Sequence, residues 1–293
     1  MNKLENQIDL QIESNRNKNL FHKDATKTMH FAQTLFDEIL NLKGLTENEV
    51  NVLIEYTCEK VVEEFCRVNQ YYSFGEDDKK RLKDIYRDLY FDIIQKKIPM
   101  NLLSERHYQN LKSWVEESNP FSKIMYQKED ITVQPVVCCE YSADIQKHIL
   151  HLQLEELPEP ILDVGSGKHG NLVKSLRAAG LIVYGIDRFS DCSWVEKADW
   201  LTYDYGMEKW GTIISNLGFS NHFLHHHLRE EGNFIGYAKK YMEILNSLKL
   251  HGRMYYAPEL PFIEQYLDKN SYSITKHAIE NISLKATMIK RLK

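Results

Sequence analysis

One stretch of this sequence constrains the fold more than any other. Residues 160–170 read PILDVGSGKHG, and after a helical run residues 181–187 read LIVYGID. This order predicts a strand, a glycine turn, a helix and a second strand that ends in an acid. Glycines let the backbone turn sharply and approach a ligand closely, and the helix N-terminus directs free amide groups to the same place. Because Asp187 can accept hydrogen bonds from ribose hydroxyls, the layout predicts a nucleotide-binding site.

Two cofactors compete for this turn. The spacing Gly165-x-Gly167-x-x-Gly170 satisfies the fingerprint of dinucleotide-binding proteins, which would make the chain an NAD(P)-dependent oxidoreductase. Asp163 lies two positions before the first glycine, where a negative charge opposes a pyrophosphate but suits an ammonium group. That position favours S-adenosylmethionine, because its methionine part carries an ammonium group.

The surrounding residues carry a family resemblance. Residues 161–167 (ILDVGSG) resemble motif I of the class I (Rossmann-like) S-adenosylmethionine-dependent methyltransferases, and Gly185-Ile-Asp187 resembles their second motif. The resemblance covers about residues 140–293, and the N-terminal part of the chain resembles no family that we can name. It implies a methyltransferase with S-adenosylmethionine as its cofactor and a sheet that ends in an antiparallel hairpin.

The resemblance also implies how the cofactor is held. The glycine turn is expected beside the methionine portion, with Asp163 near its ammonium group and Asp187 on the ribose hydroxyls. Asp199 is expected to receive the adenine amino group, with Trp200 on or near adenine, and Asp204 is the alternative acid. The expected cofactor-binding residues are Tyr141, Asp163, Gly165, Ser166, Gly167, Asp187, Asp199, Trp200 and Asn216. Tyr141 is a lid candidate, and Trp200, Tyr141 and Asn216 could equally serve packing or strand termination.

Beyond residue 130 the strand and helix signals alternate, which predicts an α/β domain with a doubly wound, mostly parallel, seven-stranded sheet. We therefore expect an all-helical N-terminal domain at 1–130 and a Rossmann-like S-adenosylmethionine-binding domain at 131–293. The expected strands lie near 160–164, 182–186, 195–199, 211–215 and 253–257, followed by a hairpin of 272–276 and 284–291.

Apolar residues recur at helical spacing from about residue 20 to 118. Thr46 and Glu49 form a capping box, and Asn119-Pro120 should end the last helix of this segment. Residues 1–20 are polar and are expected to form a loose arm. The helices are expected at 28–42, from Thr46 onward, at 78–96 and at 104–117.

Three histidines follow the fourth expected strand. His222, His225 and His226 would share one face of a helix, and one of them could act as general base beside the methyl acceptor. A metal site is a weaker alternative, since no carboxylate or thiolate partner has a fixed spacing, and we expect no metal. A solvated or half-packed helix start is the third interpretation.

The acceptor is expected to be a small molecule with a hydroxyl or amine. Asn216-Leu-Gly-Phe stands where DNA-methylating and protein-amide-methylating branches of the family carry Asn/Asp-Pro-Pro-aromatic, which disfavours those substrates. The helical domain would cover the pocket or form a homodimer. A non-catalytic S-adenosylmethionine-binding module stays open as an alternative function.

Composition narrows the remaining choices. The chain has 293 residues and a formal net charge of -5, which gives no broad attraction to nucleic acid. No stretch approaches the ~20 apolar residues of a membrane span, and residues 1–6 lack the apolar core of a signal peptide, so we expect a cytoplasmic protein. Its five cysteines show no metal-ligand spacing, and their odd number argues against a secreted disulfide framework.

Overall fold

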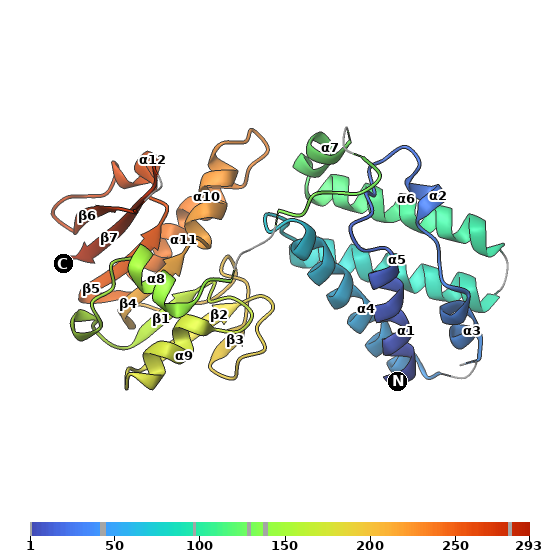
Figure 1. The fold of residues 1–293 in the computed structure, drawn as a ribbon, viewed down its shortest axis with the longest axis horizontal. Coiled ribbons are helices and arrows are strands. Elements are labelled where there is room, and N and C mark those ends of the chain that lie inside the picture. The colour runs from blue at the N-terminus through green and yellow to red at the C-terminus, as the bar shows by residue number, and fades with distance from the viewer. Residues whose placement is uncertain (1, 42–44, 96–97, 128–129, 137–139, 281–282) are drawn as a thin grey trace. The chain divides into compact units, whose positions relative to one another are not determined.

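The structure is a computed structural model that describes residues 2–41, 45–95, 98–127, 130–136, 140–280 and 283–293 (Figure 1). It forms two compact units, Met1–Cys138 and Cys139–Lys293. The division lies eight residues beyond the expected boundary at 130. The reason is that the connecting backbone pairs with the helical unit, through bridges from Lys18 to Thr132 and from Asn69 to Val136.

The first unit consists of helices joined by loops. Its core includes side chains from five of them, among them Leu35, Leu53, Ile93 and Leu103. The helices are α1 (Asn2–Ser14), α2 (Ala25–Thr28), α3 (Gln33–Asn41), α4 (Glu47–Val68), α5 (Glu76–Gln95), α6 (Met100–Ser118) and α7 (Phe121–Tyr126).

The expected loose arm at residues 1–20 is wrong, because its first fourteen residues contain a packed helix. On α1, Leu4 and Ile8 are four residues apart and therefore lie on one face. Both side chains are buried in the core of the unit. Leu4, Ile8 and Gln11 are buried, and Ile12 packs against the same core, so one face of α1 docks the helix.

A single helix over residues 28–42 is also wrong for the residues described, since α2 ends at Thr28 and α3 begins at Gln33. The side chain of Gln11 explains the break. Its Nε2 donates to the His30 carbonyl at 2.7 Å, and its Oε1 accepts from the Ala32 amide at 2.6 Å. These bonds replace the ones that a continuous helix would supply. Residues 42–44, where the predicted helix ends, lie outside the described residues.

The other helix predictions are confirmed with small shifts. The capping box at Thr46 is present, since its side chain accepts from the Glu49 amide and the Glu49 side chain accepts from the Thr46 amide. Helix α5 covers the segment expected at 78–96 as far as Gln95. Helix α6 begins four residues earlier than expected and ends at Ser118, directly before Asn119-Pro120.

The second unit has the predicted seven-stranded sheet, in the order β3-β2-β1-β4-β5-β7-β6. The first five strands are parallel, and β7 and β6 form the antiparallel hairpin at one edge. The strands are β1 (Ile161–Val164), β2 (Val183–Asp187), β3 (Val195–Lys197), β4 (Trp210–Asn216), β5 (Leu248–Ala257), β6 (Tyr272–Ala278) and β7 (Lys285–Arg291). The predicted fold class is therefore confirmed.

Helices cover both faces of this sheet (Figure 1). Along β1, Leu162 and Val164 belong to the core beneath α10 (Phe219–His227) and α11 (Phe234–Asn246), whereas Ile161 belongs to the core beneath α8 (Ala143–Ile149) and α9 (Asn171–Ala178). Side chains alternate along a strand, so Asp163 lies on the same face as Ile161. The same unit also contains α12 (Pro261–Glu264) and a short 3-10 helix at Leu154–Glu156.

Candidate cofactor site

Three polar side chains lie on the same face of the sheet, at the carboxyl ends of adjacent parallel strands. Asp163 on β1 pairs in register with Gly185 on β2 and Ile214 on β4. Asp187 and Asn216 lie two residues further along β2 and β4, so strand alternation places their side chains on the same face as that of Asp163. In open parallel sheets this edge is where ligands bind.

Asp163 is buried without a hydrogen-bonding partner. Its side chain belongs to a residue only 1% exposed, and neither carboxylate oxygen accepts a hydrogen bond from any described residue. Burial, followed by the neighbouring Asp187, raises the pKa of Asp163 to about 8. A carboxyl group in such a place is stable as the neutral acid or beside a cation. The site therefore suits a ligand that brings positive charge and N–H donors.

Asn216 adds a third acceptor on the same face. Its residue is 9% exposed, and its Oδ1 makes no hydrogen bond within the described parts of the chain. Together with the two oxygens of Asp163, it leaves three buried acceptor atoms on neighbouring strands. An ammonium group carries three N–H donors, which matches this set of acceptors.

Asp187 is held in a fixed position by the glycine turn. Its Oδ2 accepts from the Gly167 amide at 3.1 Å, and its Oδ1 accepts from the Phe189 amide at 2.9 Å. Burial raises the pKa of Asp187, and these two hydrogen bonds oppose the shift. Each carboxylate oxygen can accept more than one bond, so Asp187 can still receive ribose hydroxyls.

The glycine turn needs glycine at both 165 and 167. Their φ angles are +75° and +77°, in the left-handed region that side chains disfavour. A Cβ on Gly165 would lie 2.8 Å from the Trp200 ring, and a Cβ on Gly167 would lie 3.4 Å from Glu140 Oε1. Ser166 between them is buried, and its hydroxyl lies against Gly185 of β2. The turn is thus packed on both sides.

Glu140 is a site residue that sequence reasoning missed. Its Oε1 accepts from the Lys168 amide at 2.6 Å, at the end of the turn that leads into α9. The backbone carbonyl of Tyr141 accepts from Asn171 Nδ2 at 3.3 Å. The segment before α8 therefore lies against the turn, with the Glu140 side chain in contact, and the role of Tyr141 as a lid over the cofactor stays a prediction. Nothing in the spacing of Glu140 marked it for this position.

Asp199 and Trp200 follow β3 and lie on the other side of the turn. Asp199 Oδ1 accepts from the Leu201 amide at 2.8 Å, which orders the chain into a tight turn. Trp200 is half-buried, lies against Gly165 and Gly218, and donates from Nε1 to the Tyr237 hydroxyl at 3.4 Å. Their predicted contacts with adenine stay predictions.

The three histidines of α10 have different surroundings. His222 is 3% exposed and packs edge-on against Trp200, with ring centroids 4.8 Å apart. His226 stacks on Tyr237, and its Nδ1 accepts from the Asn233 amide at 3.2 Å, so it holds the connection to α11. Burial lowers the pKa of His225 to about 3 and that of His226 to about 4, and lowers that of His222 well below its usual range. All three are neutral near pH 7, and a catalytic role for any of them stays a prediction.

Arg188 also lies at this site and was not predicted. Its guanidinium carbon is 5.9 Å from the centroid of the Trp200 ring. Burial raises the pKa of Asp187 and the charge of Arg188 opposes that rise, whereas burial and then Arg188 both lower the pKa of His222. The position directly after Asp187 was the available signal, because that residue must lie at the same strand end.

The described residues also bear on metal binding, on cysteine chemistry and on membrane spanning. There, no group of three or more His, Cys, Asp or Glu side chains could hold a metal ion. Cys58, Cys66 and Cys192 are buried, and Cys138 and Cys139 lie outside the described residues. None of the helices in the described ranges combines the length and apolarity that crossing a bilayer requires.

The sheet order, the terminal hairpin and the glycine turn after β1 give the second unit the Rossmann-like methyltransferase fold that the resemblance implied. No family model and no curated protein matches the chain.

Among solved structures, the chain is similar to the N-methyltransferase NodS from Bradyrhizobium japonicum WM9, in complex with S-adenosyl-L-homocysteine. The identity is 11%, with 51% of this chain and 85% of that chain covered and a TM-score of 0.37. It is also similar to the 1,6-didemethyltoxoflavin-N1-methyltransferase of Burkholderia thailandensis, at 13% identity, 52% and 76% coverage and a TM-score of 0.34. At these values the likeness assigns no activity or ligand to this chain.

Proposed function

We propose that this chain is an S-adenosylmethionine-dependent methyltransferase that acts on a hydroxyl or amine of a small molecule. The observation that carries the proposal is Asp163, a buried carboxyl group at the end of β1 with no hydrogen-bonding partner among the described residues. The ammonium group of a methionine moiety supplies the charge and the donors that such a group requires.

The residues fit the whole cofactor in the proposed arrangement. Asp163 and Asn216 offer the buried acceptors for the ammonium group, and Asp187 offers its remaining lone pairs to the ribose hydroxyls. Asp199 follows β3, and its Oδ2 makes no hydrogen bond to a described residue, so it can accept from the adenine amino group. Trp200 supplies an aromatic wall beside the turn.

A dinucleotide fits the same turn less well. Glu140, Asp163 and Asp187 surround the backbone at 165–168, and the charges of Glu140 on Asp187 and of Asp187 on Asp163 raise the pKa of the neighbour. A pyrophosphate would add two negative charges at this place. Glu140 also accepts a hydrogen bond from the Lys168 amide, which is one of the donors that a phosphate at the start of α9 would need.

Methyl transfer requires little from the protein beyond the positioning of cofactor and acceptor. The cofactor carries a methyl group already activated on a sulfonium, so alignment and exclusion of water supply much of the rate. For an acceptor that arrives protonated, His222 is the base in this proposal, since its ring packs against Trp200 beside the turn. A His222→Gln variant that binds cofactor and methylates as fast as wild type would remove that role.

Calorimetric titration tests the cofactor assignment. We expect saturable binding of S-adenosylmethionine and S-adenosylhomocysteine by the full chain, and none of NAD+ or NADPH. Asp187→Ala should weaken binding of both adenosyl compounds by about tenfold or more, because it removes a charged acceptor for the ribose. Asp144→Ala is the matched control, since the Asp144 carboxylate is exposed and pairs with Lys147.

Binding of NAD+ or NADPH in place of the adenosyl compounds would overturn the proposed function. Binding of S-adenosylmethionine without turnover of any acceptor would instead support the non-catalytic binding module.

A further inference from the structure

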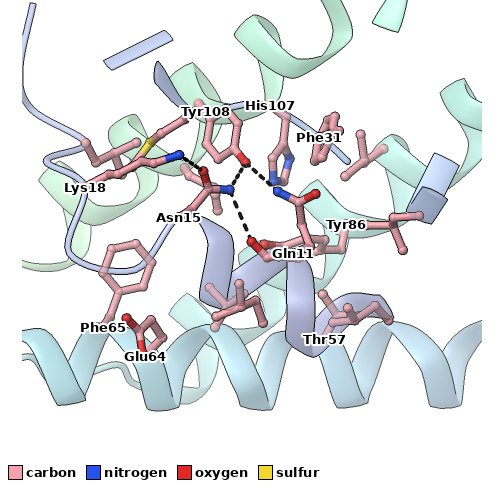
Figure 2. Close-up of a pocket in the computed structure, with 18 of the residues that line it drawn as sticks. Gln11, Asn15, Lys18, Phe31, Thr57, Glu64, Phe65, Tyr86, His107 and Tyr108 are labelled. Atoms are coloured by element: carbon pink, nitrogen blue, oxygen red, sulfur yellow. Dashed lines mark hydrogen bonds between the residues drawn. The ribbon is translucent and has the colours of Figure 1, made fainter. Parts of the chain in front are cut away.

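The helical unit contains a cavity that belongs to no part of the proposed cofactor site (Figure 2). Its volume is about 190 Å³, and side chains from α1, α3, α4, α5 and α6 line it. An apolar protein cavity of about 150 Å³ is large enough to bind benzene. The space in this unit therefore admits a ligand of about one ring.

The walls are mainly apolar and aromatic. Most lining side chains are aliphatic or aromatic, among them Ile8, Phe31, Leu35, Leu53, Val61 and Leu111. The two charged residues on the wall already have partners. Lys18 Nζ donates to Asn15 Oδ1 at 2.9 Å, and Glu64 pairs with Arg67 at 2.7 Å. Most of the wall is apolar, and burying a charged ligand against apolar side chains is costly, so the ligand should be neutral.

Tyr108 on α6 brings a hydroxyl to this cavity. The hydroxyl oxygen accepts from Asn15 Nδ2 at 2.7 Å and from Gln11 Nε2 at 3.5 Å, as Figure 2 shows. Its own proton has no acceptor among the described residues. The side chain of Gln11 already bonds the His30 carbonyl and the Ala32 amide. Tyr108 can therefore donate one hydrogen bond to a ligand.

His107, the neighbour of Tyr108 on α6, has unused hydrogen-bonding capacity. Its residue is 4% exposed, and its ring lies between Phe31 and Tyr86, with centroids 5.3 and 5.0 Å away. The buried Nδ1 makes no hydrogen bond within the described ranges. Burial lowers the pKa of His107 to about 3, so the imidazole is neutral and offers one donor and one acceptor. Leaving such a group unpaired is costly.

We propose that this cavity is a binding site for a neutral, single-ring compound that carries a hydroxyl group. A hydroxyl both donates and accepts, so it can donate to the acceptor nitrogen of His107 and accept from the Tyr108 hydroxyl. The His107 and Tyr108 rings are edge-to-face neighbours, with centroids 5.4 Å apart, and both line the cavity. The ring of the ligand would pack against the aromatic and aliphatic side chains of the wall. The site is independent of the proposed methyltransferase activity.

Phenol and toluene test this proposal, because they differ by a hydroxyl in place of a methyl group. In calorimetric titrations of the full chain, phenol should bind saturably with one site and at least about tenfold more tightly than toluene. His107→Phe and Tyr108→Phe should each reduce that preference to about twofold or less. Tyr56→Phe is the matched control, since Tyr56 does not line the cavity and bonds Asp9.

The His107→Phe variant also reports on folding. An aromatic ring without unpaired nitrogens replaces the imidazole between Phe31 and Tyr86, so the variant should melt no lower than wild type. Loss of phenol binding by a variant of unchanged melting temperature supports the site. Equal binding of phenol and toluene, unchanged phenol binding by His107→Phe, or no saturable phenol binding at all would overturn the proposal.

Discussion

At the residue scale, the central group is Asp163, whose protonation depends on what lies beside it. In the structure, burial and the charge of Asp187 favour the neutral acid. A cation at the same place would favour the carboxylate. An acid that is costly to ionise in the free protein is what a binding site for an ammonium group requires, and structural packing alone gives no reason to keep it.

The same group predicts a pH-dependent cost in stability. The pKa of Asp163 is about 8 in the folded chain and about 4 when unfolded, so ionisation opposes folding as pH rises between those values. Asp163→Asn should remove this cost. Without ligand, the free energy of unfolding of the variant should exceed that of wild type by an amount that grows by about 1.4 kcal/mol per pH unit within that range. Above pH 8 this difference should become constant.

Denaturant unfolding at pH 5, 6, 7 and 8 measures this difference. Asp144→Asn is a suitable control, because Asp144 is exposed at the start of α8. A constant difference between Asp163→Asn and wild type over the four pH values would contradict the burial argument.

The positions of the motif residues could be predicted from local sequence, although their roles stay predictions. Asp163, Asp187 and the glycines lie at the expected strand ends because β1 is a short run that leads into Gly165 and β2 is a short run that ends in Asp187. Glu140 could not be assigned from its own neighbours, since it acts through a tertiary contact with the Lys168 amide, whereas the position of Arg188 directly after Asp187 was a signal that the prediction did not use. The apolar cavity and the position of His107 in it have no sequence signal either.

At the scale of elements, the strands were easier to predict than the first helices. Strands β1 and β4 are short and buried along their whole length, and each leads into a turn, so their signal is local to the sequence. The errors came from α1 and from the break between α2 and α3, where Gln11 decides the outcome. A long-range side-chain bond of this kind overrides helical periodicity, and no window of sequence contains both partners.

Gln11→Ala tests this explanation. The change leaves the His30 carbonyl and the Ala32 amide without their partner, so we expect a loss of about 1–3 kcal/mol in the free energy of unfolding. Gln7→Ala on the same helix is the matched control, because Gln7 makes no hydrogen bond with a described residue, and it should change stability by less than about 0.5 kcal/mol. Equal effects of the two changes in chemical denaturation would refute the role of Gln11.

At the scale of the whole molecule, the chain combines an α/β unit that has a family resemblance with a helical unit that has none. Each unit has its own core and its own candidate site: the glycine turn in one, the cavity in the other. Each ligand should stabilise the unit that binds it by RT ln(1 + [L]/Kd). The two proposals can therefore fail or succeed separately.

Proton release on cofactor binding tests the central claim most directly. At pH 7 the free site holds Asp163 mainly as the neutral acid, and a bound ammonium group lowers its pKa. Titration with S-adenosylhomocysteine in two buffers of different ionisation enthalpy should therefore show release of most of a proton per ligand. Asp163→Asn should bind at least tenfold more weakly and release none. Tight binding without proton release by wild type, or equal release by both proteins, would contradict the account.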